Sequence, residues 1–383
     1  MQYRSFGKLD WRVSALGFGA MRLPTTDGDP AHINEPEAIR MIRYAIDHGV
    51  NYLDSAYLYH MGNSERLVGK ALKDGYREKM KLATKIPPRS VETADDFDRI
   101  LNEQLAKLQT DKINFYLLHG LNAESWPKMR DLGILPWAEK AIASGRIDHL
   151  GFSFHDKLAV LKEIIDYYDN WAFCQVQYNF MDIENQAGRV GVEYAASKGL
   201  GVVVMEPIRG GLLAKEPPQA VKELWNSGLH KWTQAEWALQ WVWNQPEVSV
   251  ALSGMSTMAQ VEENVVSANR SGPGSLSSAD LDLLGKVREA YRELAPIPCT
   301  ACGYCQPCPN GVLIPDIFRL YNEAVMYGDF NVGKFRYAGP AGIKPEERAD
   351  QCVECGNCEE ACPQQMAVID WLKRVHEALA PTS

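Results

Sequence analysis

Eight of the nine cysteines in this 383-residue chain lie in two short windows near its C-terminal end. The first window contains Cys299, Cys302, Cys305 and Cys308, and the second contains Cys352, Cys355, Cys358 and Cys362. Three cysteines spaced by two residues can place thiolates at three corners of an iron–sulfur cubane, whereas a displaced fourth cysteine followed by proline points towards another cluster. Both windows end in Cys-Pro, so their spacing predicts two 4Fe-4S clusters.

The second window matches, residue for residue, the C-x2-C-x2-C-x3-C-P run of bacterial ferredoxins, in which the fourth cysteine binds the other cluster. By that crossing rule we assign one cluster to Cys299, Cys302, Cys305 and Cys362, and the other to Cys352, Cys355, Cys358 and Cys308. The first window is one residue shorter before Cys308 than this run. Paired C-x2-C units also form tetrahedral zinc sites, so two zinc ions are the alternative, although zinc requires neither cysteine triplets nor the Cys-Pro ending.

Four polar residues in the first third of the chain could deliver a proton to a carbonyl group. Asp54, Lys85 and His119 each end a short apolar segment, and Tyr59 follows Asp54 by five residues. Reduction of a carbonyl needs a proton as hydride arrives, and Tyr59 can supply it. Lys85 would lower the pKa of Tyr59 by stabilising the phenolate, and Asp54 would keep Lys85 charged. His119 would hydrogen-bond the carbonyl oxygen and orient it.

Each of the four residues also has an ordinary structural explanation. Asp54 could cap a helix, Tyr59 could pack its ring, Lys85 could be a surface cation, and His119 could be a hydrogen-bonded core histidine. Four such groups at the ends of consecutive predicted strands, however, favour a catalytic site.

Short apolar or β-branched runs alternate with longer amphipathic segments through the first 270 residues. The short runs predict strands near 14–18, 50–53, 81–86, 113–118, 148–153, 173–177, 201–205 and 248–252. The amphipathic segments predict helices near 36–49, 64–74, 94–108, 134–144, 157–167, 187–198, 234–244 and 259–269. Eight such units indicate an α/β fold, a (β/α)8 TIM barrel with its chemistry at the C-terminal strand ends. A doubly wound sheet is the alternative, but Gly17-Phe-Gly19 belongs to no complete G-x-G-x-x-G motif.

The same strand ends carry a family resemblance. Asn51-Tyr-Leu-Asp54-Ser-Ala-Tyr-Leu-Tyr59, followed by Asn63-Ser-Glu65 and Val68-Gly69, resembles the signature of the aldo-keto reductases. Ala83-Thr-Lys85, Tyr116-Leu-Leu-His119, Gly151-Phe-Ser153 and Val261-Glu-Glu-Asn264 continue the resemblance, which spans residues 1–270. The resemblance implies carbonyl or alcohol chemistry with nicotinamide as the hydride cofactor.

Nicotinamide-binding residues follow from the resemblance as well. Ser153 and Gln175 match the positions that hold the nicotinamide ring, while Met205-Glu-Pro207 replaces the aromatic residue that commonly stacks on it. The segment holding Gly254, Ser256, Gln260 and Asn264 opens the last helix, where phosphate groups would meet free amides. Relatives that select NADPH usually carry Lys and Arg there, so Gly254 and Gln260 favour NADH. Arg209 is the nearby cation that we nominate, with an exposed loop arginine as its alternative.

A linker with one helix is predicted between the two parts, over 271–298. The region 299–383 then forms a two-cluster ferredoxin-type domain. Amphipathic patterns predict helices over 314–326 and 366–379, so this domain resembles the helical two-cluster ferredoxins.

Composition excludes several classes of protein. The formal net charge of −9 and the absence of clustered Lys and Arg exclude a nucleic-acid surface. The N-terminal residues contain scattered charges and no apolar run of the length that a signal peptide or membrane span needs. We therefore expect a cytoplasmic protein with no membrane partner.

These patterns predict an oxidoreductase of the aldo-keto reductase type with NAD(P)H, two 4Fe-4S clusters and a small carbonyl or alcohol substrate. Hydride transfer moves two electrons at once, so the clusters would be structural or would connect the barrel to a one-electron carrier such as ferredoxin. One alternative is an electron-transfer or redox-sensing protein with a degenerate barrel site. Another is a non-redox lyase or isomerase that uses Tyr59, Lys85 and His119.

Overall fold

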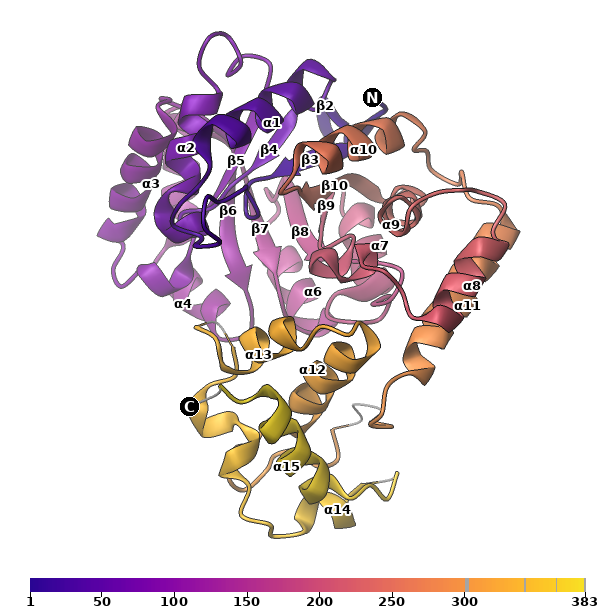
Figure 1. Cartoon of the computed structure of the whole chain (residues 1–383). Helices are drawn as coiled ribbons and strands as arrows, with labels where there is room; N and C mark the ends of the chain where they lie inside the picture. Colours follow the sequence, from indigo (N-terminus) through magenta and orange to yellow (C-terminus); the bar gives the residue numbers. More distant parts are fainter. Residues whose placement is uncertain (300–302, 341, 363, 382–383) are drawn as a thin grey trace. The chain divides into compact units, whose positions relative to one another are not determined.

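The computed structural model describes residues 1–299, 303–340, 342–362 and 364–381, and these residues form two compact units (Figure 1). The barrel unit contains residues 1–214 and 232–277, and the C-terminal unit contains residues 215–231 and those from 278 onwards. The excursion over 215–231 means that the second unit is built from two stretches of the chain. The predicted linker over 271–298 contains helix α11 (Ser278–Glu293), which packs against α8 (Gln219–Ser227).

Eight parallel strands close into a barrel, which confirms the predicted TIM-barrel fold. In order around the barrel they are β3 (Leu16–Gly19), β4 (Tyr52–Asp54), β5 (Lys81–Ile86), β6 (Ile113–Leu121), β7 (Ile147–Phe154), β8 (Phe173–Gln177), β9 (Gly201–Met205) and β10 (Val248–Gly254), and β10 pairs with β3. Asp54 is in register with Ala83, and Lys85 with Leu117. The residues at the C-terminal ends of neighbouring strands therefore lie side by side.

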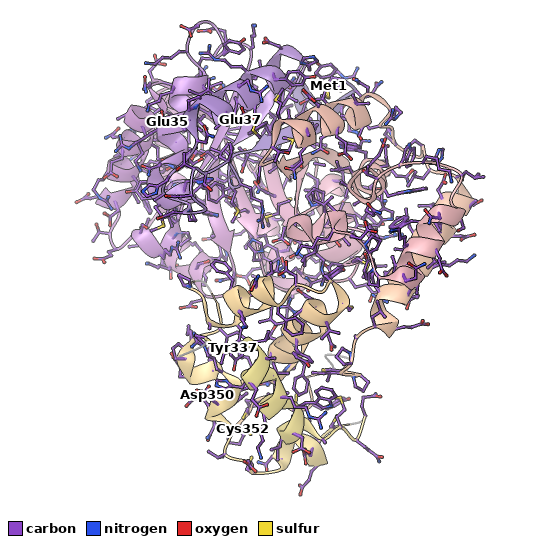
Figure 2. The ribbon with its side chains drawn as sticks, in the orientation of Figure 1. Met1, Glu35, Glu37, Tyr337, Asp350 and Cys352 are labelled. Carbon is purple, nitrogen blue, oxygen red and sulfur yellow. The ribbon has the colours of Figure 1, made fainter. Side chains whose placement is uncertain are left out.

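Helices surround the barrel where the amphipathic patterns predict them. They are α1 (Glu35–Asp47), α2 (Ser64–Ala71), α3 (Asp95–Leu108), α4 (Ser125–Asp131), α5 (Ile134–Ala143), α6 (Leu158–Tyr167), α7 (Gly188–Ser197), α9 (Gln234–Trp243) and α10 (Met258–Asn269), of which the sequence did not predict α4. Helix α1 starts where Asn34 accepts a hydrogen bond from the Glu37 backbone amide, at 3.4 Å. Glu35 and Glu37 then place negative charge in its first turn, beside the positive end of the helix dipole (Figure 2).

An N-terminal hairpin that the sequence did not predict covers one end of the barrel. It consists of β1 (Tyr3–Phe6) and β2 (Leu9–Ser14). Phe6 is buried against Phe115, with ring centroids 4.9 Å apart, and against Phe173, the first residue of β8. The turn requires Gly7, which has φ of +54° and would place a Cβ only 2.4 Å from the Gly201 amide nitrogen. The hairpin thus closes the N-terminal end of the barrel and leaves the opposite end for chemistry.

The C-terminal unit is helical, as expected. After α8 and α11 it contains α12 (Ile314–Met326), α13 (Phe330–Ala338), α14 (Asn357–Glu360) and α15 (Val368–Leu379). The predicted helix over 314–326 has these bounds, and the helix predicted over 366–379 begins two residues later. Helix α13 was not predicted. In the part of the chain that the structure describes, no helix has the length and apolar character needed to cross a membrane.

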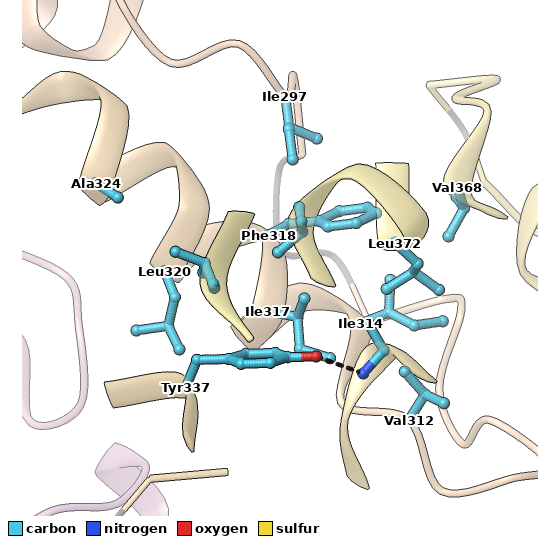
Figure 3. Packing of buried hydrophobic residues seen from close by; sticks show 13 residues of the cluster. Ile297, Val312, Ile314, Ile317, Phe318, Leu320, Ala324, Tyr337, Val368 and Leu372 are labelled. Carbon is cyan, nitrogen blue, oxygen red and sulfur yellow. Dashed lines mark hydrogen bonds between the residues drawn. The ribbon is translucent and has the colours of Figure 1, made fainter. Parts of the chain in front are cut away.

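The core of the C-terminal unit gathers side chains from α12, α15 and the segments between them (Figure 3). Its members include Ile314, Ile317, Phe318, Leu320, Val368, Leu372 and Val375. Tyr337 is a fully buried member of this core, and its hydroxyl accepts a hydrogen bond from the Ala349 amide at 3.0 Å. Several cysteines pack against the same core, so the core fixes the segments that hold them.

Candidate active site and cluster-binding cysteines

Lys85 is the centre of a polar group at the C-terminal ends of β4 and β5. Its Nζ donates hydrogen bonds to Asp54 Oδ1, to the Ser55 carbonyl oxygen at 2.7 Å and to the Tyr59 hydroxyl at 3.4 Å. The Lys85 side chain is fully buried and that of Asp54 is 4% exposed. All three donors of the ammonium group therefore have acceptors, which is the condition under which a buried charge is tolerated.

His119, near the end of β6, completes the group. Its ring lies edge-on to the Tyr59 ring, with centroids 5.8 Å apart and planes at 82°. The structure thus brings together the four residues that the sequence selected, from three neighbouring strands and one loop. The Lys85 ammonium also lies 4.9 Å from the centroid of the Tyr59 ring.

Burial and charge act in opposite directions on these groups. Burial raises the pKa of Tyr59, and the positive charge of Lys85 opposes that rise without cancelling it. The sequence argument expected a lowered tyrosine pKa because it included Lys85 and not the loss of water. For Lys85, burial is the largest single effect and favours the neutral form, but the charges and hydrogen bonds of Asp54 and Tyr59 together outweigh it, so the pKa of Lys85 is raised and the amine stays protonated.

His119 is held neutral. Burial is the main cause that places its pKa well below the ordinary value, and the Lys85 charge adds to the effect. A neutral imidazole can still donate one hydrogen bond to a carbonyl oxygen, and it does not compete with Tyr59 as the acid.

This histidine should make folding stability depend on pH. Below about pH 6.5 the unfolded chain binds a proton that the folded site does not, so the free energy of unfolding should fall, by at most about 1.4 kcal/mol per pH unit for this group. The slope between pH 7 and 5.5, measured by urea unfolding, should be smaller in His119→Gln. Equal slopes in the two proteins would contradict a neutral His119.

A second network of buried polar side chains contacts the backbone of Lys85. Glu65, fully buried in α2, accepts hydrogen bonds from Thr84 Oγ1 at 2.6 Å and from Gln104 Nε2 at 2.7 Å. Gln104 Nε2 also donates to the Lys85 carbonyl oxygen at 3.0 Å, and the Tyr116 hydroxyl donates to Gln104 Oε1 at 2.8 Å. This network fixes the backbone on which Lys85 stands. Its partners come from α2, α3, β5 and β6, so spacing along the chain gave no signal for it.

The turn that carries Tyr59 is held from one side by His60. Its Nε2 accepts a hydrogen bond from the Leu23 amide at 3.1 Å, so its Nδ1 donates to the Pro30 carbonyl oxygen at 2.8 Å. His60 and Met61 both have left-handed backbone conformations, with φ of +52° and +54°. Non-glycine residues rarely adopt this conformation, and such strain is concentrated at functional sites.

The residues expected to hold the nicotinamide ring lie on β7, on β8, at the end of β9 and just beyond it. Ser153 Oγ accepts a hydrogen bond from the Gly120 amide at 2.7 Å. Gln175 Nε2 lies 3.7 Å from Met205 Sδ, while Gln175 Oε1 is buried and has no hydrogen-bond partner among the described residues. Pro207 is buried two residues beyond Met205. An unsatisfied amide oxygen beside a strand end is suited to accept a hydrogen bond from a ligand amide.

Arg209 differs from the exposed loop arginine that was its alternative. Its side chain is 8% exposed, and its Nε donates to Asp182 Oδ2 at 2.9 Å. Asp182 also accepts hydrogen bonds from Gln177 and Asn179, each at 3.2 Å. This cation is therefore tied into a local network.

The residues at the start of α10, the last helix of the barrel, form hydrogen bonds with one another. Thr257 and Gln260 form a capping box at the start of α10, and Gln260 Oε1 also accepts from the Ser256 amide at 2.8 Å. Asn264 Nδ2 donates to Ser253 Oγ at 3.0 Å. Gln260 thus caps the helix, at a position where NADPH-selective relatives would carry a phosphate-binding cation.

Arg22, which the sequence argument did not consider, lies beside this segment. A Cβ on Gly254 would come within 3.2 Å of the Arg22 side chain, and Ser256 Oγ donates to the Arg22 carbonyl oxygen at 2.8 Å. The exposed Arg22 side chain therefore brings a cation from the β3 loop to the residues that open α10. It comes from the other end of the barrel sequence, so motif spacing could not place it there.

One cavity in the C-terminal unit collects the cysteines assigned to a single cluster. Cys308, Cys352, Cys355 and Cys358 all line this cavity of about 230 Å³, together with Cys305. Cys308 thus lies beside the three cysteines of the second window to which the crossing rule assigns it, although Cys305, assigned to the other cluster, lines the cavity too. Among the described residues, no three His, Cys, Asp or Glu side chains converge as they would around a single metal ion. The donor set fits a four-thiolate cluster, which is larger than one ion.

The second set of cysteines is described in part. Cys299, Cys305 and Cys362 are partly exposed. Cys302 and Pro363 lie outside the described residues.

An eight-stranded parallel barrel that brings a tyrosine, a lysine, an aspartate and a histidine together at its C-terminal end is the architecture of a barrel oxidoreductase. Residues 15–272 match the model of the Aldo/keto reductase family, and the chain belongs to this family. Residues 298–367 match the 4Fe-4S dicluster domain.

Relatives of known or suspected activity cover the barrel region. The chain is 27% identical over 289 residues to a probable aldo-keto reductase 1 of Glycine max, which covers 68% of this chain and 82% of that protein. It is 27% identical over 327 residues to L-galactose dehydrogenase of Arabidopsis thaliana, which covers 78% and 94%.

Solved structures show the same fold. The holo form of an aldo-keto reductase from Bacillus halodurans matches with a TM-score of 0.63 and 29% identity, and the match covers 75% of this chain and 96% of that one. An aldo-keto reductase from Klebsiella pneumoniae, solved in complex with NADPH, matches with a TM-score of 0.59 and 24% identity, over 75% and 96%.

Proposed function

We propose that this chain is a nicotinamide-dependent oxidoreductase that interconverts a carbonyl and an alcohol at Tyr59, and that its C-terminal unit binds two 4Fe-4S clusters. The observation that carries the proposal is the buried Lys85 ammonium, which hydrogen-bonds Asp54, the Ser55 carbonyl and Tyr59. The L-galactose dehydrogenase relative, whose name denotes dehydrogenation of a sugar, supports the same class of chemistry.

In the proposed reaction, Tyr59, Lys85 and Asp54 transfer the proton and stabilise the resulting charge. Tyr59 donates its hydroxyl proton to the carbonyl oxygen, and Lys85 stabilises the resulting phenolate with a positive charge that Asp54 holds in place. Neutral His119 donates a hydrogen bond to the same oxygen and orients it. Nicotinamide, when bound, supplies the hydride for reduction or accepts it for oxidation. The elevated pKa of Tyr59 keeps the hydroxyl protonated before the carbonyl arrives.

The nicotinamide site uses Ser153, Gln175 and Met205 for the ring, and the residues that open α10 for the phosphates. Two features bear on the choice between NADH and NADPH. Gly254 and Gln260 offer no charge and favour NADH, whereas the Arg22 side chain, whose methylene groups lie beside Gly254, adds a cation to this region and favours NADPH. Fluorescence titration of the holoprotein with each nucleotide, followed by reduction of small aldehydes monitored at the nicotinamide absorbance band, tests the proposal. Failure to bind either nucleotide at millimolar concentration would overturn it.

We infer that the eight cysteines of the two windows hold the clusters, in the crossing pattern that joins Cys308 to the second window. Anaerobically purified protein should contain about eight iron atoms and as many sulfides per chain. Cys358→Ser should retain about four irons, because it removes a ligand of one cluster. Cys174→Ser should retain all of them, since Cys174 is buried in β8 and burial raises the pKa of its thiol to about 12. Zinc in place of iron, or a full iron content in Cys358→Ser, would contradict the assignment.

A second candidate function is electron transfer through a barrel that binds nicotinamide weakly. The observation that favours it is Met205, which stands where an aromatic residue usually stacks on the ring and contacts Gln175 instead. The two functions differ in one measurement: NAD(P)H should bleach the cluster absorbance only if the barrel and the clusters exchange electrons. Cysteine thiols stay reduced and available as cluster ligands in the cytosol, so we propose a cytoplasmic location.

A further inference from the structure

The cavity that holds Cys308, Cys352, Cys355 and Cys358 is open to solvent through an uncharged, mostly apolar rim. Tyr304 and Val353 line the cavity and are 69% and 63% exposed. We call the exposed lining residues the cluster mouth, which comprises Tyr304, Pro307, Pro309, Asn310, Val353, Cys355, Asn357 and Ala361. A valine and a tyrosine that are both mostly exposed at one opening are consistent with a contact surface.

The inner wall of the same cavity is well anchored. Ile314 and Leu372 line it and belong to the core of the C-terminal unit, where they are 2% and 1% exposed. The cavity therefore has a fixed apolar wall on one side and an uncharged, exposed rim on the other. A redox centre held there would be separated from solvent by the rim side chains and the Cys355 thiolate.

Around this mouth the chain is strongly acidic. Between positions 346 and 370 there are seven acidic side chains and a single basic one, Arg348. Asp350, Glu354 and Glu360 are exposed, and Figure 2 shows Asp350 close along the chain to Cys352. Glu354 is paired with Lys373 at 2.8 Å, which neutralises one of these charges. Four thiolates around a cluster add further negative charge, so the potential at the mouth is negative.

We propose that the cluster mouth is the docking surface for a one-electron carrier protein whose own redox centre is surrounded by positively charged side chains. The inference rests on the proposed function, since it requires a cluster on these four cysteines. In each encounter one electron crosses the mouth, so the donor loses one electron and the acceptor gains one, with no bond made or broken. The mostly apolar rim allows close approach, and the acidic surroundings select a basic partner and repel an acidic one.

Small outer-sphere oxidants of opposite charge test the potential at the mouth. The reduced holoprotein should react with hexaamminecobalt(III), a cation, and with the cobalt(III) complex of ethylenediaminetetraacetate, an anion, in stopped-flow experiments. As salt rises from about 10 mM to 0.3 M, the rate constant for the cation should fall and that for the anion should rise, because added ions screen the acidic surface. The opposite salt dependence would overturn the proposal without any variant.

Substitution of three acidic residues around the cluster mouth, which we call the mouth variant, tests whether the effect comes from this region of the surface. The combined variant Asp350→Asn, Glu354→Gln, Glu360→Gln should react about tenfold more slowly with the cation at low salt, and faster with the anion. A change in cluster potential would shift both rates in the same direction, so opposite shifts identify the electrostatic effect. The matched control Asp282→Asn, Glu289→Gln, Glu293→Gln removes three exposed acidic charges from α11, which lies apart from α14 in Figure 1, and should leave both rates within about twofold.

A protein-sized probe tests docking itself. The basic haem protein cytochrome c should bind the oxidised holoprotein at low salt, by calorimetry, and the mouth variant should weaken this binding about tenfold, whereas the α11 control should not. Equal binding by the mouth variant, with its cluster absorbance intact, would overturn the inference alone. Wild-type protein that contains no iron or sulfide would instead overturn the proposed function on which the inference rests.

Discussion

Tyr59→Phe is expected to lower kcat for carbonyl reduction by about 10² to 10⁴, with little change in nicotinamide affinity. The substitution removes only the hydroxyl, which is the proton donor in the proposed reaction, and general acid catalysis contributes a factor of this size. The phenylalanine ring can keep the edge-on contact with His119, so the fold of the site should persist. Single-turnover measurement of nicotinamide oxidation with a saturating aldehyde separates the chemical step from product release.

The neighbouring Tyr57 provides a matched control on the same loop. Its hydroxyl donates to Glu103 at 2.6 Å, outside the Lys85 group. Tyr57→Phe should therefore retain kcat within about threefold, apart from the loss of one partly exposed hydrogen bond. Wild-type turnover in Tyr59→Phe would show that another group protonates the carbonyl. A loss of equal size in both variants would show that the effect comes from the loop and not from proton transfer.

The barrel was predictable because its signals are local. Each strand of a TIM barrel is buried on both faces and appears as a short apolar run, so that β5 was placed over 81–86, the bounds that the structure gives. The hairpin β1–β2 gave no such signal, because its residues alternate with charges such as Arg4 and Arg12 and resemble an exposed N-terminal segment. Its burial depends on the open end of a barrel that is completed only by β10.

Only those parts of the site that lie at strand ends could be predicted from the sequence. Asp54, Lys85 and His119 could be selected because each follows an apolar run, and register brings those ends together. The direction of the Tyr59 pKa shift was not predictable, since it depends on how much water the folded site excludes. Arg209 pairs with Asp182, 27 positions away, and Arg22 reaches Gly254 across the junction that closes the barrel. Hydrophobic patterns and motif spacing in a single sequence do not show which distant residues will be in contact.

Lys85→Met is expected to lower the free energy of unfolding by about 3 to 5 kcal/mol and to abolish carbonyl reduction. The substitution leaves the Asp54 carboxylate buried without its cation, and an uncompensated buried charge has a cost of this size. Urea unfolding followed by tryptophan fluorescence reports mainly on the barrel unit, which holds eight of the ten tryptophans. Unchanged stability would contradict a charged Asp54–Lys85 pair.

The double variant Asp54→Leu, Lys85→Met separates the structural role of this pair from its catalytic role. Replacing both partners with apolar side chains removes the unpaired charge, so most of the lost stability should return while activity stays absent.

The pH dependence of the single variant gives an independent check. Burial already raises the pKa of Asp54, and loss of Lys85 raises it further, so the folded protein binds a proton more readily than the unfolded chain does. Destabilisation in Lys85→Met should therefore shrink as pH falls through the raised pKa and grow as pH rises. A double variant as unstable as Lys85→Met would mean that the stability depends on the lysine's hydrogen bonds to Ser55 and Tyr59 rather than on its charge.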